Sequence, residues 1–118
     1  MAILSETWKI WHQADLSATT WDYATAIPNN TWAEVWIQLC ERGSAAGTYR
    51  VALRNAGAAL ADDHYVRYDV VLAALGVPEI GPFMVGPKTI IGVYSANADV
   101  SVTIHGKFKL KAADITSP

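Results

Sequence analysis

The segment Thr-Trp-Ala-Glu-Val-Trp-Ile-Gln-Leu-Cys, residues 31 to 40, decides the fold because its hydropathy alternates with a period of two. Aliphatic side chains occupy every second position, at Ala33, Val35, Ile37 and Leu39. The positions between them carry larger or polar side chains, at Trp32, Glu34, Trp36 and Gln38. Because successive side chains of a strand point to opposite faces, this segment is predicted to be a strand with an aliphatic inner face and a mixed outer face.

The same alternation predicts further strands on both sides of this segment. They cover residues 7–13, 20–25, 49–54, 64–72, 89–95, 100–105 and 107–111. The turn residues that follow Cys40 and those that follow Ser95 each predict a hairpin between the two strands they connect. Residues 56–63 are expected to form a loop, and the prolines of residues 76–83 place that segment along a sheet edge.

Two of these strands carry more specific expectations. In residues 64–72 one face is expected to hold His64, Val66, Tyr68, Val70 and Leu72, and the other Tyr65, Arg67, Asp69 and Val71. In residues 107–111 the three lysines are expected to point outward, with Phe108 and Leu110 inward. Because lysines on an exposed edge deter pairing with another chain, we expect that strand to lie at an edge.

The strand pattern indicates the fold class and a single domain. About seven to eight short strands, with no long helical period, predict an all-β antiparallel β-sandwich of the jelly-roll type. No linker or fixed repeat divides the 118 residues. Within this domain we distinguish a Trp-rich N-terminal arm or pair of strands at 1–23, a sandwich at 24–112 and a flexible tail at 113–118.

The composition limits the partners and the compartment. The chain is 52% hydrophobic and 17% charged, so some apolar surface is expected to face a partner. A net charge of −2 argues against nucleic acid, which attracts basic proteins. No apolar run approaches the ~20 residues of a membrane-spanning helix, and the N-terminus does not read as a secretory signal. The single cysteine, Cys40, excludes an internal disulfide and suits a reducing compartment.

The three histidines do not form a metal-binding pattern. His12, His64 and His105 stand far apart in the sequence, without the spacing that would place two ligands on one ion. The cluster Asp62-Asp63-His64 could bind a hard cation or exchange protons, but a solvated loop explains it more simply. We therefore expect no metal and no cofactor.

Catalytic residue types are also without a recognisable arrangement. Neither Cys40 nor any serine lies in a nucleophile motif, and the glycines do not form a phosphate-binding loop. A glycosidase pair assembled from Glu34, Asp69 or Glu79 would be guesswork. The sequence therefore predicts that the protein is not an enzyme.

The tryptophans are the most informative residues. All five lie in the first third of the chain, at Trp8, Trp11, Trp21, Trp32 and Trp36. Core packing explains most single tryptophans, but this asymmetry favours a shared role. Trp32 and Trp36 share the outer face of their strand, so either the N-terminal strands or another molecule must cover them. We expect the five residues to contribute to a subunit interface, because Trp is frequent at interface hot spots. Stacking on sugar rings is the alternative.

Residues 40 to 69 resemble a known family. They read Cys-Glu-Arg-Gly-Ser-Ala-Ala-Gly-Thr-Tyr-Arg-Val-Ala-Leu-Arg-Asn-Ala-Gly-Ala-Ala-Leu-Ala-Asp-Asp-His-Tyr-Val-Arg-Tyr-Asp. The Cys-x-Arg turn, the Arg-Val-Ala strand, the Gly-containing loop and the His-Tyr-x-x-Tyr-Asp strand are similar to small β-sandwich virion proteins of tailed bacteriophages. The likeness spans residues 24 to 110, whereas residues 1 to 23 depart from the pattern. It implies a particle component and carries over no active residue.

The resulting hypothesis is a phage virion structural protein, either a capsid decoration (cement) protein or a tail or baseplate accessory. It would be made in the host cytoplasm and built into the virion beside major capsid or tail proteins. We expect a symmetric homo-oligomer, with a trimer as one option, and neither nucleic acid nor membrane as partner. The alternative is a glycan-binding, host-recognition domain on a virion fibre, in which Trp32 and Trp36 would contact a surface glycan.

Overall fold

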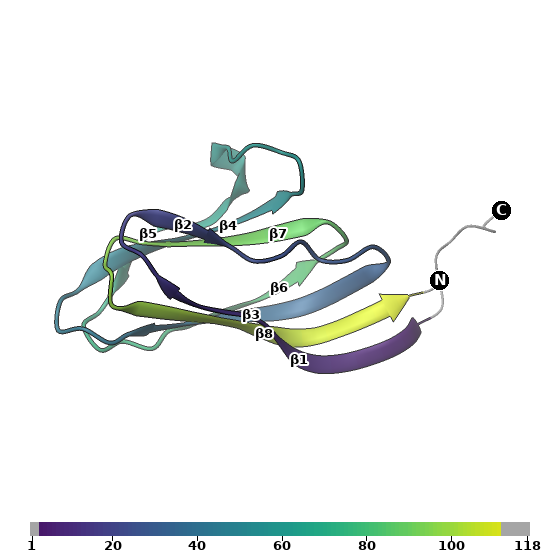
Figure 1. Cartoon of the computed structure of the whole chain (residues 1–118), viewed down its shortest axis with the longest axis horizontal. Helices are drawn as coiled ribbons and strands as arrows, with labels where there is room; N and C mark the ends of the chain where they lie inside the picture. The colour runs from purple at the N-terminus through teal and green to yellow at the C-terminus, as the bar shows by residue number, and fades with distance from the viewer. Residues whose placement is uncertain (1–2, 112–118) are drawn as a thin grey trace.

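The protein is a sandwich of two β-sheets. The computed structural model describes residues 3–111. Its elements are β1 (Ile3–Leu16), β2 (Thr20–Tyr23), β3 (Thr31–Glu41), β4 (Gly47–Asn55), the 3-10 turn η1 (Asp62–His64), β5 (Tyr65–Leu72), β6 (Glu79–Val85), β7 (Thr89–Ser95) and β8 (Val100–Lys111). The strands form two layers that face each other, with η1 and the loop before it standing away from them (Figure 1). The predicted all-β sandwich is confirmed.

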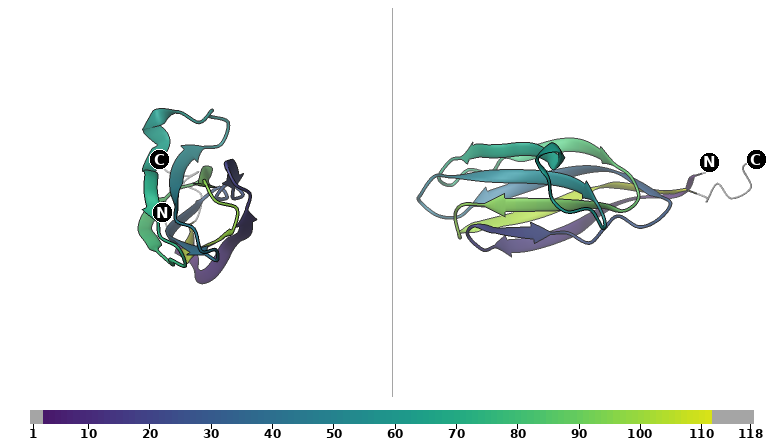
Figure 2. Two further views of the ribbon diagram at one scale, coloured as in Figure 1. Left: turned by 90° about the vertical axis from the view of Figure 1, so that its left-hand side faces the viewer. Right: turned by 90° about the horizontal axis from the view of Figure 1, so that it is seen from above.

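The strand order is that of a jelly roll. Sheet A has the order β1-β8-β3-β6 and sheet B the order β2-β7-β4-β5, and every pairing is antiparallel. Along the described chain β4 and β5 are the only consecutive strands that share a sheet, since every other connection passes from one layer to the other. Figure 2 shows this arrangement end-on and from above. Eight strands connected in this way form the two interleaved Greek keys of a jelly roll.

Both predicted hairpins are wrong. β3 lies in sheet A and β4 in sheet B, and β7 and β8 are divided between the sheets in the same way. The alternating pattern reports only that a strand has one buried face. Two such strands can bury their aliphatic faces against each other from opposite layers as well as side by side in one layer. The turns after β3 and β7 therefore connect the layers.

The lysine-rich strand is central, which corrects its predicted place at an edge. β8 is hydrogen-bonded to β1 on one side and to β3 on the other. Its lysines do point outward, and Phe108 is buried, but Leu110 is 39% exposed. A lysine on the outer face of a central strand has the same sequence pattern as a lysine on an edge strand, so the pattern alone does not distinguish the two.

The core lies between the two sheets. The aliphatic residues predicted for the inner face of β3 are all buried, from Ala33 at 2% to Leu39 at 0% exposure. They pack with inward side chains of the facing sheet, among them Tyr49, Val51, Ile91 and Val93. This alternation of buried and half-buried residues confirms that β3 has one aliphatic and one mixed face.

The predicted division of β5 into two faces holds for Val66, Val70 and Leu72, which pack on the core, but it is wrong for Tyr68, which is 56% exposed, because the strand is bulged. Tyr49 of β4 pairs with Val70, Val51 with Arg67 and Ala52 with Tyr65, so β5 gains one extra residue at each of two register shifts. One extra residue in a strand reverses the side to which the following side chains point. Tyr65 and Tyr68 consequently lie together, with ring centroids 4.9 Å apart.

The N-terminal segment belongs to the sandwich. β1 forms one edge of sheet A and β2 one edge of sheet B, so residues 3–23 complete both layers. β6 forms the other edge of sheet A, as its prolines predict. The register of β6 against β3 shifts between Phe83 and Ile80, which places Pro82 at an irregular point of the pairing. The flexible tail predicted for residues 113–118 lies outside the described residues.

Candidate functional site

The outer face of sheet A carries aromatic and charged side chains in cross-strand rows. One row contains Trp8, Lys107, Glu34 and Met84, which come from β1, β8, β3 and β6 in turn. The next row contains Ile10, His105 and Trp36, and a third contains Glu6, Lys109 and Trp32. We call this surface the sheet A face. Lys107, Lys109 and Glu34 lie on the two central strands and Glu6 on the edge strand β1, while the apolar side chains of the first row lie at the edges.

Trp8 and Trp36 lie together at the middle of the sheet A face. Their ring centroids are 5.9 Å apart and their planes 24° apart, and the ring of His105 on β8 lies 6.1 Å from that of Trp36. Lys107 Nζ lies 2.9 Å from Glu6 and 5.9 Å from the centre of the Trp8 ring. Even so, Trp8 remains 63% exposed. Trp8 and Trp36 are therefore held by their neighbours on the sheet, but the Trp8 ring is still accessible from solvent.

The outer face of sheet B is a layer of aromatic rings with arginines between them. We call it the sheet B face, and it consists of Trp21, Tyr23, Arg50, Arg54, Tyr65, Tyr68 and Tyr94. Trp21 is its centre, since its ring contacts those of Tyr23, Tyr65 and Tyr94 at centroid distances of 5.5 to 5.9 Å. These contacts join β2 to β7 and to the far edge strand β5.

A glycine allows the rings to lie on the sheet. A Cβ atom at Gly92 of β7 would lie 2.7 Å from Tyr23 and 3.2 Å from Trp21. Both distances are shorter than ordinary van der Waals contact, so any side chain here would displace the rings. Gly92 therefore lets the two β2 rings cover the neighbouring strand.

Arg50 joins two tyrosines of the sheet B face. Its guanidinium lies 4.3 Å from the centre of the Tyr68 ring and 4.8 Å from that of Tyr94. Its Nε donates a hydrogen bond of 2.6 Å to Asp69. That hydrogen bond raises the pKa of Arg50 above its ordinary value, so the side chain stays charged. The arginine charge is thus neutralised locally by Asp69.

The five tryptophans predicted as one interface lie on different parts of the molecule. Trp8, Trp32 and Trp36 share the sheet A face, whereas Trp21 lies on the sheet B face. Trp11 lies at the edge between the layers, against the buried Phe108, and its indole N–H donates to the Thr25 carbonyl at 3.0 Å. The structure thus brings three of the five together. Whether any of them contacts a partner stays a prediction.

The sheet B face was missed by sequence reasoning, although part of its signal was present. Arg50 and Arg54 occupy the outward positions of a strand whose inward positions are apolar. The sequence positions of Tyr65, Tyr68 and Tyr94 did not indicate that they share one surface. Tyr65 and Tyr68 share a face because of the β5 bulge, and Tyr94 meets Trp21 because β7 pairs with β2.

The candidate catalytic residues do not converge. Each histidine lies beside a different carboxylate: His12 Nε2 is 2.6 Å from Asp22, His105 Nε2 is 3.6 Å from Glu79, and His64 Nε2 is 3.8 Å from Asp63. Across residues 3–111 no group of three or more His, Cys, Asp or Glu side chains could hold a metal ion.

The proposed carboxylate pair and the lone cysteine are likewise dispersed. Glu34 and Glu79 belong to sheet A, whereas Asp69 belongs to sheet B. Cys40 is half-buried on β3. A buried carboxylate lies one residue further on, at Glu41, which is 2% exposed.

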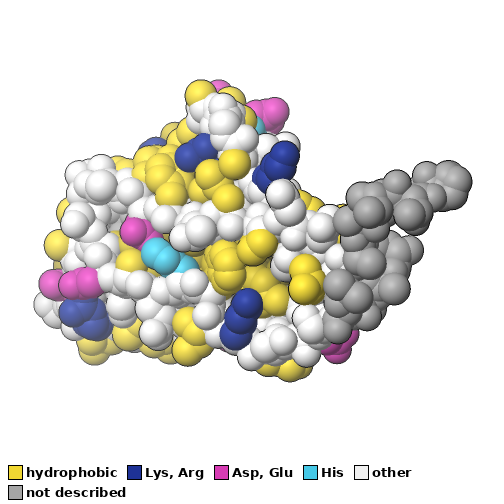
Figure 3. All heavy atoms as spheres, turned by 45° about the vertical axis from the view of Figure 1, so that its right-hand side comes forward, with side chains coloured by type: hydrophobic (Ala, Val, Ile, Leu, Met, Phe, Trp, Pro, Cys, Tyr) yellow, Lys and Arg dark blue, Asp and Glu magenta, His cyan; other side chains and the backbone are white. Residues whose placement is uncertain are grey.

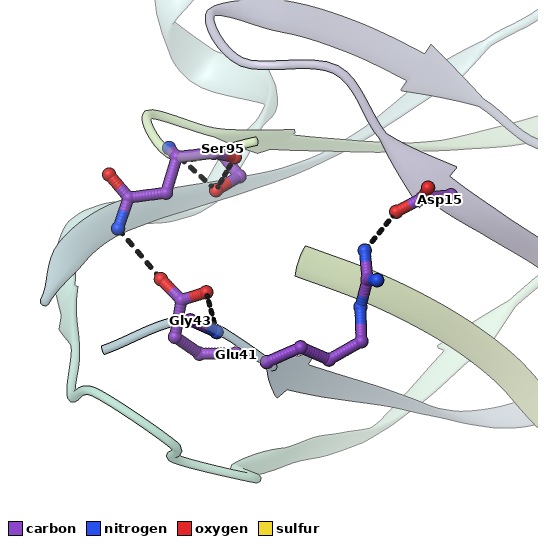
Figure 4. A network of polar contacts seen from close by, with 6 residues as sticks. Asp15, Glu41, Gly43 and Ser95 are labelled. Carbon is purple, nitrogen blue, oxygen red and sulfur yellow. Dashed lines mark hydrogen bonds and ion pairs between the residues drawn. The ribbon is translucent and has the colours of Figure 1, made fainter. Parts of the chain in front are cut away.

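Glu41 stabilises the loops at one end of the sandwich. Its carboxylate accepts hydrogen bonds from Asn97 Nδ2 at 2.7 Å and from the Gly43 amide at 3.3 Å (Figure 4). Ser95 fixes the Asn97 backbone in turn, and the neighbouring Arg42 forms an ion pair with Asp15 of β1. Both carboxylate oxygens of Glu41 thus bind within the protein. The network connects the turns after β3 and β7 and has a structural role.

The comparisons with known proteins give no family. Neither the family models, nor the curated proteins, nor the solved structures contain a match to this chain. The resemblance to phage virion proteins therefore stays a prediction. Among the described helical segments none is long and apolar enough to cross a membrane.

Proposed function

We propose that the chain is a structural subunit of a phage virion, a capsid decoration (cement) protein or a tail or baseplate accessory, and that it binds neighbouring subunits through the sheet A face. The observation that carries this proposal is the exposure of large apolar side chains on one sheet. Trp8 is 63%, Ile10 59% and Met84 69% exposed. Apolar side chains gathered on one surface are typical of protein interfaces.

The jelly-roll topology supports the proposal by analogy. Eight-stranded jelly rolls occur in viral capsid proteins and also in lectins, so the fold is compatible with assembly without requiring it. Figure 3, which views the two layers from the side, shows hydrophobic side chains between charged and histidine side chains. The rows of the sheet A face have a similar mixture, which is typical of subunit interfaces in which apolar contacts are surrounded by polar ones.

The mechanism would be thermodynamic. Burying apolar area against a capsid or tail protein contributes roughly 25 cal/mol per Å² and stabilises the assembled particle relative to free subunits. A symmetric homo-oligomer, such as a trimer, would present several copies of the sheet A face. The protein would need no catalytic group, metal or cofactor for this role and would be located in the virion.

The first experiment compares particles with and without the protein. Phage particles lacking the gene should lose infectivity faster on heating or osmotic shock, and a density map of complete particles should contain the jelly roll. Unchanged survival together with no density for the chain would refute the proposal.

A matched pair of variants tests the surface itself. Met84→Ser should lower the amount of protein bound to particles, because Met84 lies on the sheet A face. Val71→Ser is the control, since Val71 is 72% exposed on β5 of the other sheet. Equal occupancy of the two variants on purified particles would argue against the sheet A face as the interface.

A further inference from the structure

The sheet B face contains a hollow that the proposed assembly through sheet A leaves free. It is lined by Asp62, Tyr65 and Tyr68 and has a volume of about 340 Å³. Its two aromatic walls stand at 86° to each other. The third residue comes from η1, which precedes β5 directly. The hollow is therefore a corner with two ring surfaces and one carboxylate.

The aromatic walls are held in place before any ligand binds. Tyr65 is supported from behind by Trp21, whose ring centroid is 5.8 Å away. Tyr68 packs on the Arg50 guanidinium, and that group is in turn held by Asp69. Because these rings lose little further freedom on binding, a ligand that stacks on them would bind at a low entropic cost.

The charges around the hollow favour a neutral ligand. Asp62 and Asp63 are exposed beside it, while the nearest arginine is neutralised by Asp69. The Asp62 carboxylate would repel an anionic ligand, whereas a hydroxyl group can donate a hydrogen bond to it. Tyr68 is 56% exposed, so its ring is accessible from solvent.

We propose that this corner binds an uncharged sugar residue, which stacks on Tyr68 or Tyr65 and donates a hydroxyl hydrogen bond to Asp62. A pyranose ring combines an apolar C–H surface with hydroxyl groups at its rim, which matches the arrangement of two rings and one carboxylate.

This site differs from the one that the sequence suggested. On the sheet A face Trp36 is flanked by Trp8 and His105, and the Lys111 ammonium lies 4.8 Å from the centre of the Trp32 ring. The hollow lined by Asp62, Tyr65 and Tyr68 is instead on sheet B. The sugar site and the assembly interface can therefore be tested separately.

The experiment titrates the full chain with three neutral hexasaccharides, cellohexaose, maltohexaose and chitohexaose, and with the anionic hexagalacturonate. Binding is followed by intrinsic fluorescence and by chemical-shift changes in NMR spectra. At least one neutral hexasaccharide should bind in the millimolar range or tighter and should shift the signals of Tyr65 and Tyr68. Hexagalacturonate should bind at least tenfold more weakly, about 1.4 kcal/mol. If no neutral hexasaccharide binds, the proposal is wrong.

Variants locate the binding. Tyr68→Ala should weaken it about tenfold, Tyr68→Phe should retain it because the ring remains, and Asp62→Ala should weaken it severalfold. Trp8→Ala, on the other sheet, is the control and should bind normally. Equal affinity of Tyr68→Ala and the native chain would refute the assignment.

A protein partner on the same face would give a different result. If sedimentation shows that the chain self-associates and that Tyr68→Ala makes it monomeric, the corner is a contact between copies of the chain, and the sugar proposal is overturned. If Tyr68→Ala loses sugar binding while its state of association is unchanged, the sugar proposal is supported. Neither outcome depends on the particle experiments.

Discussion

The two outer faces of the sandwich use aromatic residues in opposite ways. On the sheet A face, Trp8 and Met84 come from edge strands and are largely exposed, and Lys107 and Glu34 lie between them on the central strands. On the sheet B face, Trp21 from an edge strand lies flat over β7 and is enclosed by tyrosines. A ring that several others enclose, such as Trp21, is part of a fixed surface, whereas Trp8, which stacks on Trp36 alone and is 63% exposed, remains available to a partner.

The largest expected effect is at a glycine below the sheet A face. At Gly106 of β8 an added Cβ would overlap the Glu34 carbonyl oxygen and lie 2.9 Å from Val35 Cα, so the obstruction is backbone. Gly106→Ala should therefore lower the free energy of unfolding by about 3 kcal/mol or more, measured by urea denaturation. Gly86→Ala is the control, because its nearest neighbour is the Trp32 side chain at 3.5 Å. If Gly106→Ala and Gly86→Ala unfolded at similar urea concentrations, the close approach of β8 and β3 would be contradicted.

The same substitution on opposite faces gives the second test. Trp21→Ala removes a ring that contacts three tyrosines and should cost about 2 to 3 kcal/mol of stability. Trp8→Ala removes a largely exposed ring and should cost no more than about 1 kcal/mol. Thermal unfolding followed by circular dichroism compares the two. Equal losses would mean that both faces pack their rings alike.

Gly92→Ala probes the ring layer without removing a ring. The added methyl group would push against Tyr23 and Trp21, which are side chains and can move, so a loss of about 1 to 2 kcal/mol is expected. The near-ultraviolet circular dichroism should also change, because it reports the environment of aromatic rings. An unchanged spectrum would show that the rings do not rest on β7.

The ion pairs of the two faces should contribute least. Asp69→Asn weakens the contact with Arg50, and Glu6→Gln weakens the contact with Lys107. Both pairs are partly exposed, so each change should cost less than about 1 kcal/mol and should depend on salt. Asn also tolerates the left-handed backbone at position 69, where φ is 48°. A loss larger than that of Gly92→Ala would show that charge, not ring packing, organises the sheet B face.

The period-two pattern predicted seven of the eight strands and the buried side of β3, but not β6 as a strand nor the side of Tyr68 or Leu110. Every predicted strand segment overlaps a strand of the structure, although β8 unites two of them and β1 is longer than predicted. The inner residues of β3 were also predicted correctly, because alternation in a strand has a direct physical cause in the side-chain geometry. The tryptophans pointed to the sheet A face, which carries three of them, two of them in contact.

Which strands are neighbours was decided by the tertiary structure alone. Burial of an aliphatic face is compatible with pairing in one layer or packing between two layers, so residues 31–55 did not disclose that β3 and β4 separate. The pairing of β4 with β5 likewise creates the bulge that unites Tyr65 and Tyr68. A sequence specifies the polarity of each side of a strand by local chemistry, but a surface built from several strands depends on long-range hydrogen-bond register, and local chemistry does not contain that register.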